Sequence, residues 1–154
     1  MAYYTEVLQP GETVKAVATL HWLVYAKSML LFVFAAVLVA LAYSVQDDNT
    51  RRLVLLAALA AYVLMAATLV SEWLVRRGTE IVVTDRRVIY KTGLLSRRTV
   101  EMNVSKIETV DVAQSFWGRI FDFGTISVRG TGESLEMLHR IGAPLTLRNA
   151  ITAG

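Results

Sequence analysis

The sequence predicts an α+β membrane protein, in which a two-helix transmembrane hairpin precedes an antiparallel β-sandwich or barrel that ends in a short helix. Composition is the first indication, because 55% of the 154 residues are hydrophobic and only 19% are charged. A typical soluble domain has about a quarter of its residues charged, and a disordered chain needs low hydrophobicity. The second indication is patterning. Two long apolar runs fill the first half of the chain, and polar and β-branched residues alternate in the second.

The two apolar runs have the length of membrane-spanning helices. Ser28–Val45 and Leu53–Ser71 contain no charged residue. With their flanks they become the spans 22–45 and 53–75, each long enough to cross about 30 Å of hydrocarbon. Aromatic residues near the ends are typical of interfacial belts: Trp22, Tyr25, Tyr43 and Trp73. The predicted organisation is an N-terminal juxtamembrane segment (1–21), a helical hairpin (22–75) and a β domain (79–154).

Basic residues indicate the orientation of this hairpin. The polar loop Gln46–Arg52 holds Arg51 and Arg52. The opposite side carries seven basic residues: Lys15, Lys27, Arg76, Arg77, Arg86, Arg87 and Lys91. Cytoplasmic segments are enriched in Lys and Arg, so both termini are expected in the cytoplasm. A cleaved signal peptide ending near Ala40-Leu41-Ala42 is an alternative, but it requires a long n-region containing Glu6 and Glu12.

Short alternating segments separated by turns follow Gly78. Such a pattern predicts an antiparallel sandwich or open barrel, with strands expected at Thr79–Thr84, Arg87–Lys91, Arg97–Val104, Lys106–Gln114, Thr125–Arg129 and Ser134–Ile141. The alternation slips after Ile107, which indicates a β-bulge. The segment Thr13–His21 also alternates and is a candidate edge strand.

Two segments depart from the β pattern. Ser115–Asp122 has the spacing of a short helix, with Ser115 as its N-cap. Its large apolar residues are expected to fill the sandwich, and Trp117 is the candidate for contact with the membrane interface: Phe116, Trp117, Ile120 and Phe121. Pro144 suits the first turn of a closing helix whose buried face holds Leu147 and Ile151.

An ordered set of short motifs resembles the bacterial pleckstrin-homology (PH) domain that flanks membrane spans, in its short form with two spans and one domain. The motifs are Thr84-x-x-Arg87, Gly93-x-x-x-Arg97, Ile107 before a valine-rich strand, Arg119 to Gly124, Pro10-Gly11-Glu12 and His21-Trp22. The resemblance implies a β-sandwich or barrel of seven strands capped by a C-terminal helix, here a short one. It also implies a multi-pass protein of the bacterial inner (plasma) membrane.

Catalytic chemistry has no recognisable residues in this chain. Cysteine is absent and there are two histidines, so disulfides and Cys-based metal or redox sites are excluded. The family resemblance brings no catalytic motif, and we expect neither enzymatic activity nor a cofactor or metal. His139 lies on the apolar face of its expected strand, which predicts a hydrogen-bonded core histidine. The net charge of +3 does not indicate nucleic acid.

Six basic residues are the candidate binding set for anionic lipid or a partner: Arg86, Arg87, Lys91, Arg97, Arg98 and Lys106. Only Glu101 opposes them within that stretch, and basic residues near an anionic leaflet contribute about 1 kcal/mol each. PH-like folds bind headgroups through basic residues of their first hairpins, although a fold does not fix function. The alternative interpretation is ordinary surface charge that also sets membrane topology.

The functional prediction is a non-enzymatic membrane protein that presents a binding or scaffold domain at the cytoplasmic leaflet. That domain would engage anionic lipid, a protein or a second copy of itself. An accessory subunit of a larger membrane complex, with the hairpin as its contact surface, is the alternative. A pore is disfavoured because ion paths are marked by polar groups within the membrane, and both apolar runs lack charge.

Overall fold

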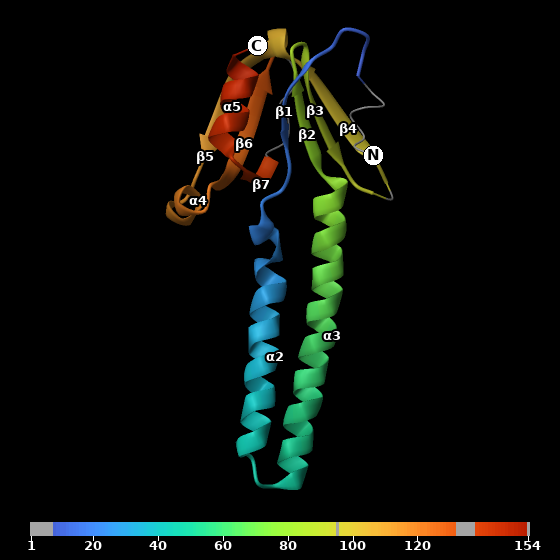
Figure 1. Ribbon diagram of the computed structural model, residues 1–154, viewed down its shortest axis with the longest axis vertical. Helices are drawn as coiled ribbons and strands as arrows, with labels where there is room; N and C mark the ends of the chain where they lie inside the picture. The colour runs from blue at the N-terminus through green and yellow to red at the C-terminus, as the bar shows by residue number, and fades with distance from the viewer. Residues whose placement is uncertain (1–7, 95, 132–137, 154) are drawn as a thin grey trace. The chain divides into compact units, whose positions relative to one another are not determined.

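The computed structural model describes residues 8–94, 96–131 and 138–153. The chain divides into two compact units, each of which is described separately. The β unit combines Met1–His21 with Val75–Gly154, and the helical unit is Trp22–Leu74. Figure 1 shows the elements in chain order from blue to red.

The helical unit is built by a short 3-10 turn, η1 (Trp22–Tyr25), and two long helices, α2 (Ala26–Ser44) and α3 (Asp48–Gly78). Both helical segments are long and apolar enough to cross a membrane, judged by length and composition. Only 17% of the most apolar stretch of Trp22–Ser44 is buried, and only 6% of that of Asp48–Gly78. Core helices of a soluble domain would be mostly covered, so these surfaces lack protein neighbours. The polar connection is shorter than the sequence suggested, because Asp47 caps α3 by accepting from the Thr50 amide at 2.8 Å.

Contacts between α2 and α3 involve small and polar side chains. The buried alanines are Ala35, Ala42, Ala58 and Ala61, and small residues allow helices to approach closely. Ser28 Oγ donates a hydrogen bond of 2.8 Å to Glu72 Oε2. Phe32 meets Tyr62 edge to face, with ring centroids 6.2 Å apart. Glu72, the acidic residue nearest the end of the second apolar run, therefore has a partner on the facing helix.

Two antiparallel sheets form the β unit. The first has the order β1-β2-β3-β4 and the second β5-β6-β7. Their strands are β1 (Val14–Ala18), β2 (Glu80–Thr84), β3 (Arg87–Thr92), β4 (Arg98–Asn103), β5 (Ile107–Ala113), β6 (Phe123–Gly130) and β7 (Leu138–Gly142). A single 3-10 turn, η2 (Val104–Lys106), links β4 to β5. The bulge expected after Ile107 lies between Ile107 and Thr109.

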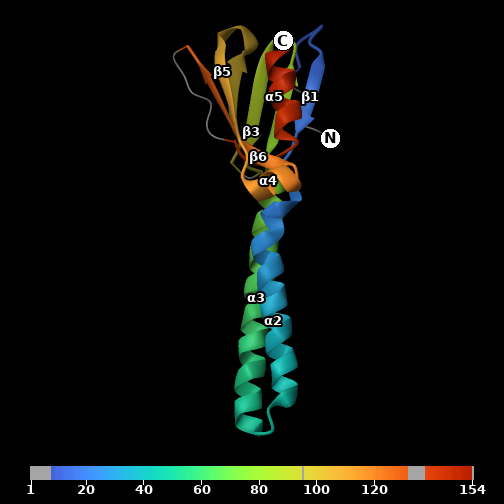
Figure 2. The ribbon, with the colours of Figure 1, turned by 90° about the vertical axis from the view of Figure 1, so that its left-hand side faces the viewer.

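Alternate residues of both sheets bury their side chains in one core. Its members include Ile81, Val83, Val88, Met102, Ile126, Val128, Leu138 and Ile141. Helix α5 (Pro144–Thr152) covers this core with Leu147 and Ile151, each 2% exposed. It contacts β1, β5 and β6, and Figure 2 shows it (red) beside β1. Pro144 stands in the first turn of α5, where its missing N–H has no helical partner to lose.

The last strand departs from the sequence prediction at its histidine. The expected residues 134–137 lie outside the described part of the chain. Within β7, Leu138 and Ile141 are buried whereas His139 and Arg140 are exposed. Arg140 has a left-handed backbone (φ 57°), which breaks the two-residue alternation. The prediction of a core histidine is therefore wrong: His139 is on the surface, with Nδ1 3.3 Å from Thr125 Oγ1.

Candidate functional site

The connections of the β unit to the helical unit lie together at one end of the β unit. The chain leaves this unit after His21 and returns at Val75. Arg76 Nε donates to the Leu20 carbonyl oxygen at 3.2 Å, which holds the two connections side by side. Gly78 packs against the turn that follows β3: a Cβ placed on Gly78 would lie 3.0 Å from the Gly93 carbonyl carbon. We call this region, with the α4 segment described next, the junction end.

Helix α4 (Phe116–Ile120) projects four large apolar side chains from the junction end. Its first turn is capped by Ser115 Oγ, which accepts from the Gly118 amide at 3.1 Å. The exposed fractions are 72% for Phe116, 61% for Trp117, 56% for Ile120 and 41% for Phe121. The prediction that these residues fill the sandwich is therefore wrong.

The reason is that α4 turns its glycine toward the sheet. Gly118 is the buried residue of the helix, and a Cβ there would lie 2.6 Å from the Phe123 carbonyl oxygen. Gln114 also holds α4 close to β6, because its side-chain amide donates to the Gly118 and Phe123 carbonyl oxygens at 3.3 and 3.2 Å. The remaining faces of this single turn then point outward. There Trp117 packs against Phe116 and Phe121, with centroid separations of 5.6 and 6.1 Å.

His21 ties α4 to the connection that leads into the first long helix. Its amide donates to the Arg140 carbonyl oxygen at 2.7 Å, and its ring stacks on Phe123 with centroids 5.5 Å apart. Burial lowers the pKa of His21, against the opposing effects of the Asp122 carboxylate and a hydrogen bond to the Phe121 backbone. This shift favours the neutral form of the ring, which packs on Phe123 and positions the connection.

The six predicted basic residues do not converge. In the β3–β4 register Arg87 faces Asn103 and Thr92 faces Arg98, so Arg86 and Arg87 lie at the far end of the hairpin from Arg97 and Arg98. Five residues of strand separate the two groups by about 17 Å. Lys91 is 8% exposed and lies across from Glu80. Lys106 is exposed at the end of η2, immediately before β5, at the end of that strand remote from α4.

Arg87 is occupied by an internal ion-pair network at the end of the β unit opposite the junction. Its Nε and one terminal nitrogen donate to the two carboxylate oxygens of Glu12, each at 2.9 Å. The other terminal nitrogen donates to Glu101 at 2.7 Å. Glu12 also accepts from the Thr84 hydroxyl at 2.7 Å and from the Gln9 amide at 2.8 Å. These donors, Arg87 first, lower the pKa of Glu12 to about 2.

This network explains two of the sequence motifs structurally. Glu12 belongs to Pro10-Gly11-Glu12, and Thr84 and Arg87 are the fixed positions of Thr84-x-x-Arg87. Thr84 Oγ1 additionally accepts from the Arg87 amide at 3.0 Å, which closes the β2–β3 turn. The Glu12 side chain has no exposed surface. The motifs thus encode a fold-defining ion pair, and Arg87 is not a surface cation available to a ligand.

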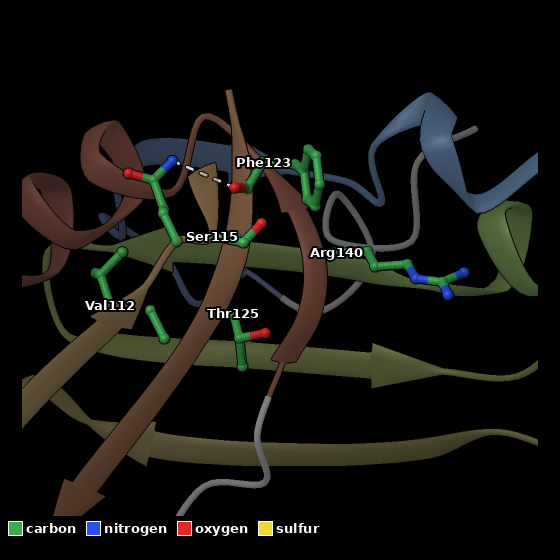
Figure 3. Close-up of a pocket in the computed structure, with 8 residues that line it drawn as sticks. Val112, Ser115, Phe123, Thr125 and Arg140 are labelled. Atoms are coloured by element: carbon green, nitrogen blue, oxygen red, sulfur yellow. Dashed lines mark hydrogen bonds between the residues drawn. The ribbon is translucent and has the colours of Figure 1, made fainter. Parts of the chain in front are cut away.

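A shallow groove of about 550 Å³ lies between the end of β5, β6 and β7 (Figure 3). Val112, Ser115, Phe123, Thr125 and Arg140 line it. Two of its polar side chains have hydrogen-bond partners: the Gln114 amide donates to the Gly118 and Phe123 carbonyl oxygens, and the Thr125 hydroxyl lies 3.3 Å from His139 Nδ1. Figure 3 shows the Arg140 side chain pointing away from Thr125. Among the described residues of its lining, Arg140 is therefore the one charged residue, and it contributes at the edge of the groove.

Two arginines that sequence reasoning did not select lie at the junction end. Arg119 is exposed on α4, and Arg140 is exposed on β7 beside His21. Arg97 and Arg98 are also exposed at this end, but they lie at the start of β4 in the first sheet, on the opposite side of the β unit from α4 (Figure 1). Asp122 is the acidic residue that follows α4. Arg119 belongs to the motif Arg119 to Gly124. A single arginine within an apolar run does not indicate whether its side chain is exposed. In the described part of the chain no group of three His, Asp or Glu side chains could hold a metal ion.

Comparison with known proteins places the chain in a family. The model of the bacterial PH domain matches residues 17–152, and the chain belongs to this family. No curated protein matches the sequence, and no solved structure matches it either. A PH-like domain suggests a binding or scaffold role.

Proposed function

We propose that this member of the bacterial PH domain family is a non-enzymatic integral membrane protein. Its helical unit anchors the β unit at the cytoplasmic face of the bacterial plasma membrane, and the β unit serves as a binding and scaffold module there. The observation that carries this proposal is the junction end. The β unit has its two connections to the long apolar helices, its exposed aromatic residues and four exposed arginines at the same end.

Two further features support the arrangement. The long helices leave their apolar surfaces uncovered, which is costly in water and expected in lipid. Strand β1 precedes both helices and pairs with β2, which follows them. The two flanking segments therefore share one side of any membrane that the helices cross. Seven basic residues flank the outer ends of the two apolar runs, against two in the polar segment between the runs, and this favours the cytoplasm as that side.

Thiol accessibility in this cysteine-free chain tests the proposal. Asn49→Cys is at the start of α3, and Glu108→Cys is on β5; both positions are exposed. In intact cells an impermeant thiol reagent should label Asn49→Cys, and Glu108→Cys should react only after the membrane is opened. Labelling of Glu108→Cys without labelling of Asn49→Cys would reverse the proposed topology. Recovery of both variants in the soluble fraction would contradict membrane anchoring.

Purification distinguishes the scaffold role from that of an accessory subunit. We expect the protein extracted in mild detergent to form a defined homo-oligomer, since a small sheet with edge strands favours pairing between copies. A second protein that co-purifies in fixed stoichiometry would support the accessory-subunit alternative. The measurement is the mass of the detergent-solubilised particle across a range of protein concentrations.

A further inference from the structure

We propose that α4, with the adjoining Phe121, is a membrane wedge that inserts its aromatic side chains into the interface of the bilayer crossed by the helical unit. This inference rests on the proposed function and deepens it, because it assigns a lipid-contacting surface to the β unit itself. The ligand is the lipid surface, with anionic headgroups at its rim.

The first step is the exposure of the apolar cluster. Four of the six residues from Phe116 to Phe121 are large and apolar, and each is at least 41% exposed. None of the four belongs to the hydrophobic core formed by the described residues, and Gly118 provides the contact of α4 with β6. The three aromatic rings pack against one another, so the cluster is ordered while it faces outward. A contiguous exposed apolar patch of this kind marks an interaction surface.

The second step is location. The Phe121 backbone contacts the ring of His21, and the residue after His21 begins the helical unit. The wedge therefore belongs to the same small region of the β unit as the chain that leads into a long apolar helix. Tryptophan is enriched at the level of lipid headgroups because its ring is amphipathic. Trp117 is 61% exposed, so its ring is accessible for contact with lipid headgroups.

The third step is charge. Arg119 lies within α4 and Arg140 lies on the neighbouring strand, and both are exposed. Asp122 is the acidic residue between α4 and β6, and the charges of these three side chains sum to +1. Arginine side chains beside inserted aromatic rings can extend to headgroup phosphates while their stems cover apolar surface. This combination is complementary to an anionic leaflet.

Area favours lipid over a second copy of the chain. A stable protein interface buries about 800 Å² on each partner, and a fully buried aromatic side chain contributes about 150–250 Å². Four side chains that are 41–72% exposed fall well short of that requirement. One helical turn with outward-pointing rings is also convex, which suits insertion between headgroups.

Spin labels on the full-length protein in vesicles test the wedge. Single cysteines are placed at Phe116→Cys and Ile120→Cys on α4, at Glu108→Cys as the exposed control, and at Val63→Cys on α3 as the hydrocarbon reference. Collisions with oxygen, which concentrates in lipid, and with a water-soluble nickel complex are measured for each label. Vesicles of phosphatidylcholine alone are compared with vesicles that also contain phosphatidylglycerol.

We expect both α4 labels to show several-fold lower accessibility to nickel than the Glu108 label, together with oxygen accessibility approaching that of the Val63 label. The difference should be larger with phosphatidylglycerol, and Arg119→Gln combined with Arg140→Gln should remove that increase. High oxygen accessibility of the Val63 label together with high nickel accessibility of the α4 labels would overturn the membrane-wedge proposal. It would leave the proposed anchoring intact. Low accessibility of α4 to both reagents would overturn it in favour of a covering protein. Nickel accessibility at Val63 would contradict the proposed function itself.

Discussion

The two ends of the β unit differ in which side chains they bury and which they expose. At the end remote from the junction, the Glu12 side chain is fully enclosed, and its carboxylate accepts hydrogen bonds from Arg87 and Thr84. At the junction end, phenyl and indole rings face outward, and exposed arginines lie at the same end. Charge is buried where apolar residues would be expected, and apolar surface is exposed where charge would be expected.

This difference separates stability from interaction. A buried, fully satisfied ion pair holds N-terminal residues against the β2–β3 turn and leaves nothing for a ligand. The rings of Phe116 and Trp117 contribute little to folding because they retain most of their contact with solvent. We therefore expect substitutions at the remote end to change the free energy of unfolding, and substitutions on α4 to change membrane contact.

The largest expected effect is that of Glu12→Ala, which leaves the Arg87 guanidinium without its main partner. Breaking a buried ion pair by removing one member costs about 3–5 kcal/mol. The free energy of unfolding of the full chain in mild detergent, followed by circular dichroism in a urea titration, measures the loss. Asp111→Ala is the control, because its pair with Arg129 is exposed and 3.9 Å long. That control should lose no more than about 1 kcal/mol. Equal losses in both variants would refute the comparison.

Acid should weaken the remote end through the same carboxylate. The pKa of Glu12 is about 2 in the folded chain against an ordinary value of 4.5. The folded pKa is depressed, so the contribution is complete above about pH 4.5 and is lost as the pH falls toward 2. The difference corresponds to about 3 kcal/mol. Glu12→Gln cannot titrate and should flatten the dependence of unfolding free energy on pH across this window. An unchanged slope would show that other carboxylates dominate.

A moderate effect is expected at the turn that meets Gly78. Gly93 has a φ of 84°, and a Cβ there would lie 1.9 Å from the Ser96 carbonyl oxygen. Gly93→Ala should therefore destabilise the β unit by about 1–3 kcal/mol. The matched control is Gly142→Ala, where the nearest atom would be the His21 Cδ2 at an ordinary 3.6 Å. The midpoint of thermal unfolding is measured for both variants and should be lower for Gly93→Ala. Similar midpoints would argue against backbone strain at Gly93.

The smallest expected effect on the free energy of unfolding is at the exposed apolar residues of α4. Phe116→Ala removes a side chain that is 72% exposed, so in detergent its unfolding free energy should change by less than about 0.5 kcal/mol. Ile126→Ala, which empties a fully buried site, should cost about 2–5 kcal/mol. A large loss from Phe116→Ala would mean that α4 belongs to the core after all.

Local patterns predicted most of the fold. Alternation located the strands and the bulge after Ile107, and Ser115 and Pro144 marked the starts of α4 and α5. These features depend on residues close in sequence. The histidine of β7 was assigned to the wrong face because Arg140 adopts a left-handed conformation that no spacing rule anticipates.

The candidate site was less predictable because its geometry depends on distant residues. The sequence pattern predicts a surface cation at Arg87, because its partner, Glu12, is 75 residues away in the chain and reaches it only in the folded domain. Four apolar residues in a short run were interpreted as core, since core is the commonest place for them in a domain surrounded by water. Their exposure depends on Gly118 facing β6, a contact between elements that the pattern of α4 alone does not contain.

The pairing of β1 with β2 also sets the order of events during synthesis. β1 is made before the helical unit and β2 immediately after it, yet Val17 must find Val82 across the intervening chain. The first sheet cannot close until both long helices have left the ribosome, and closing so long a loop carries an entropic cost. Until then β1 is an unpaired strand beside the nascent helices, where it is open to wrong partners. Insertion of the helical unit would bring the two ends of the loop to the same surface and shorten that search.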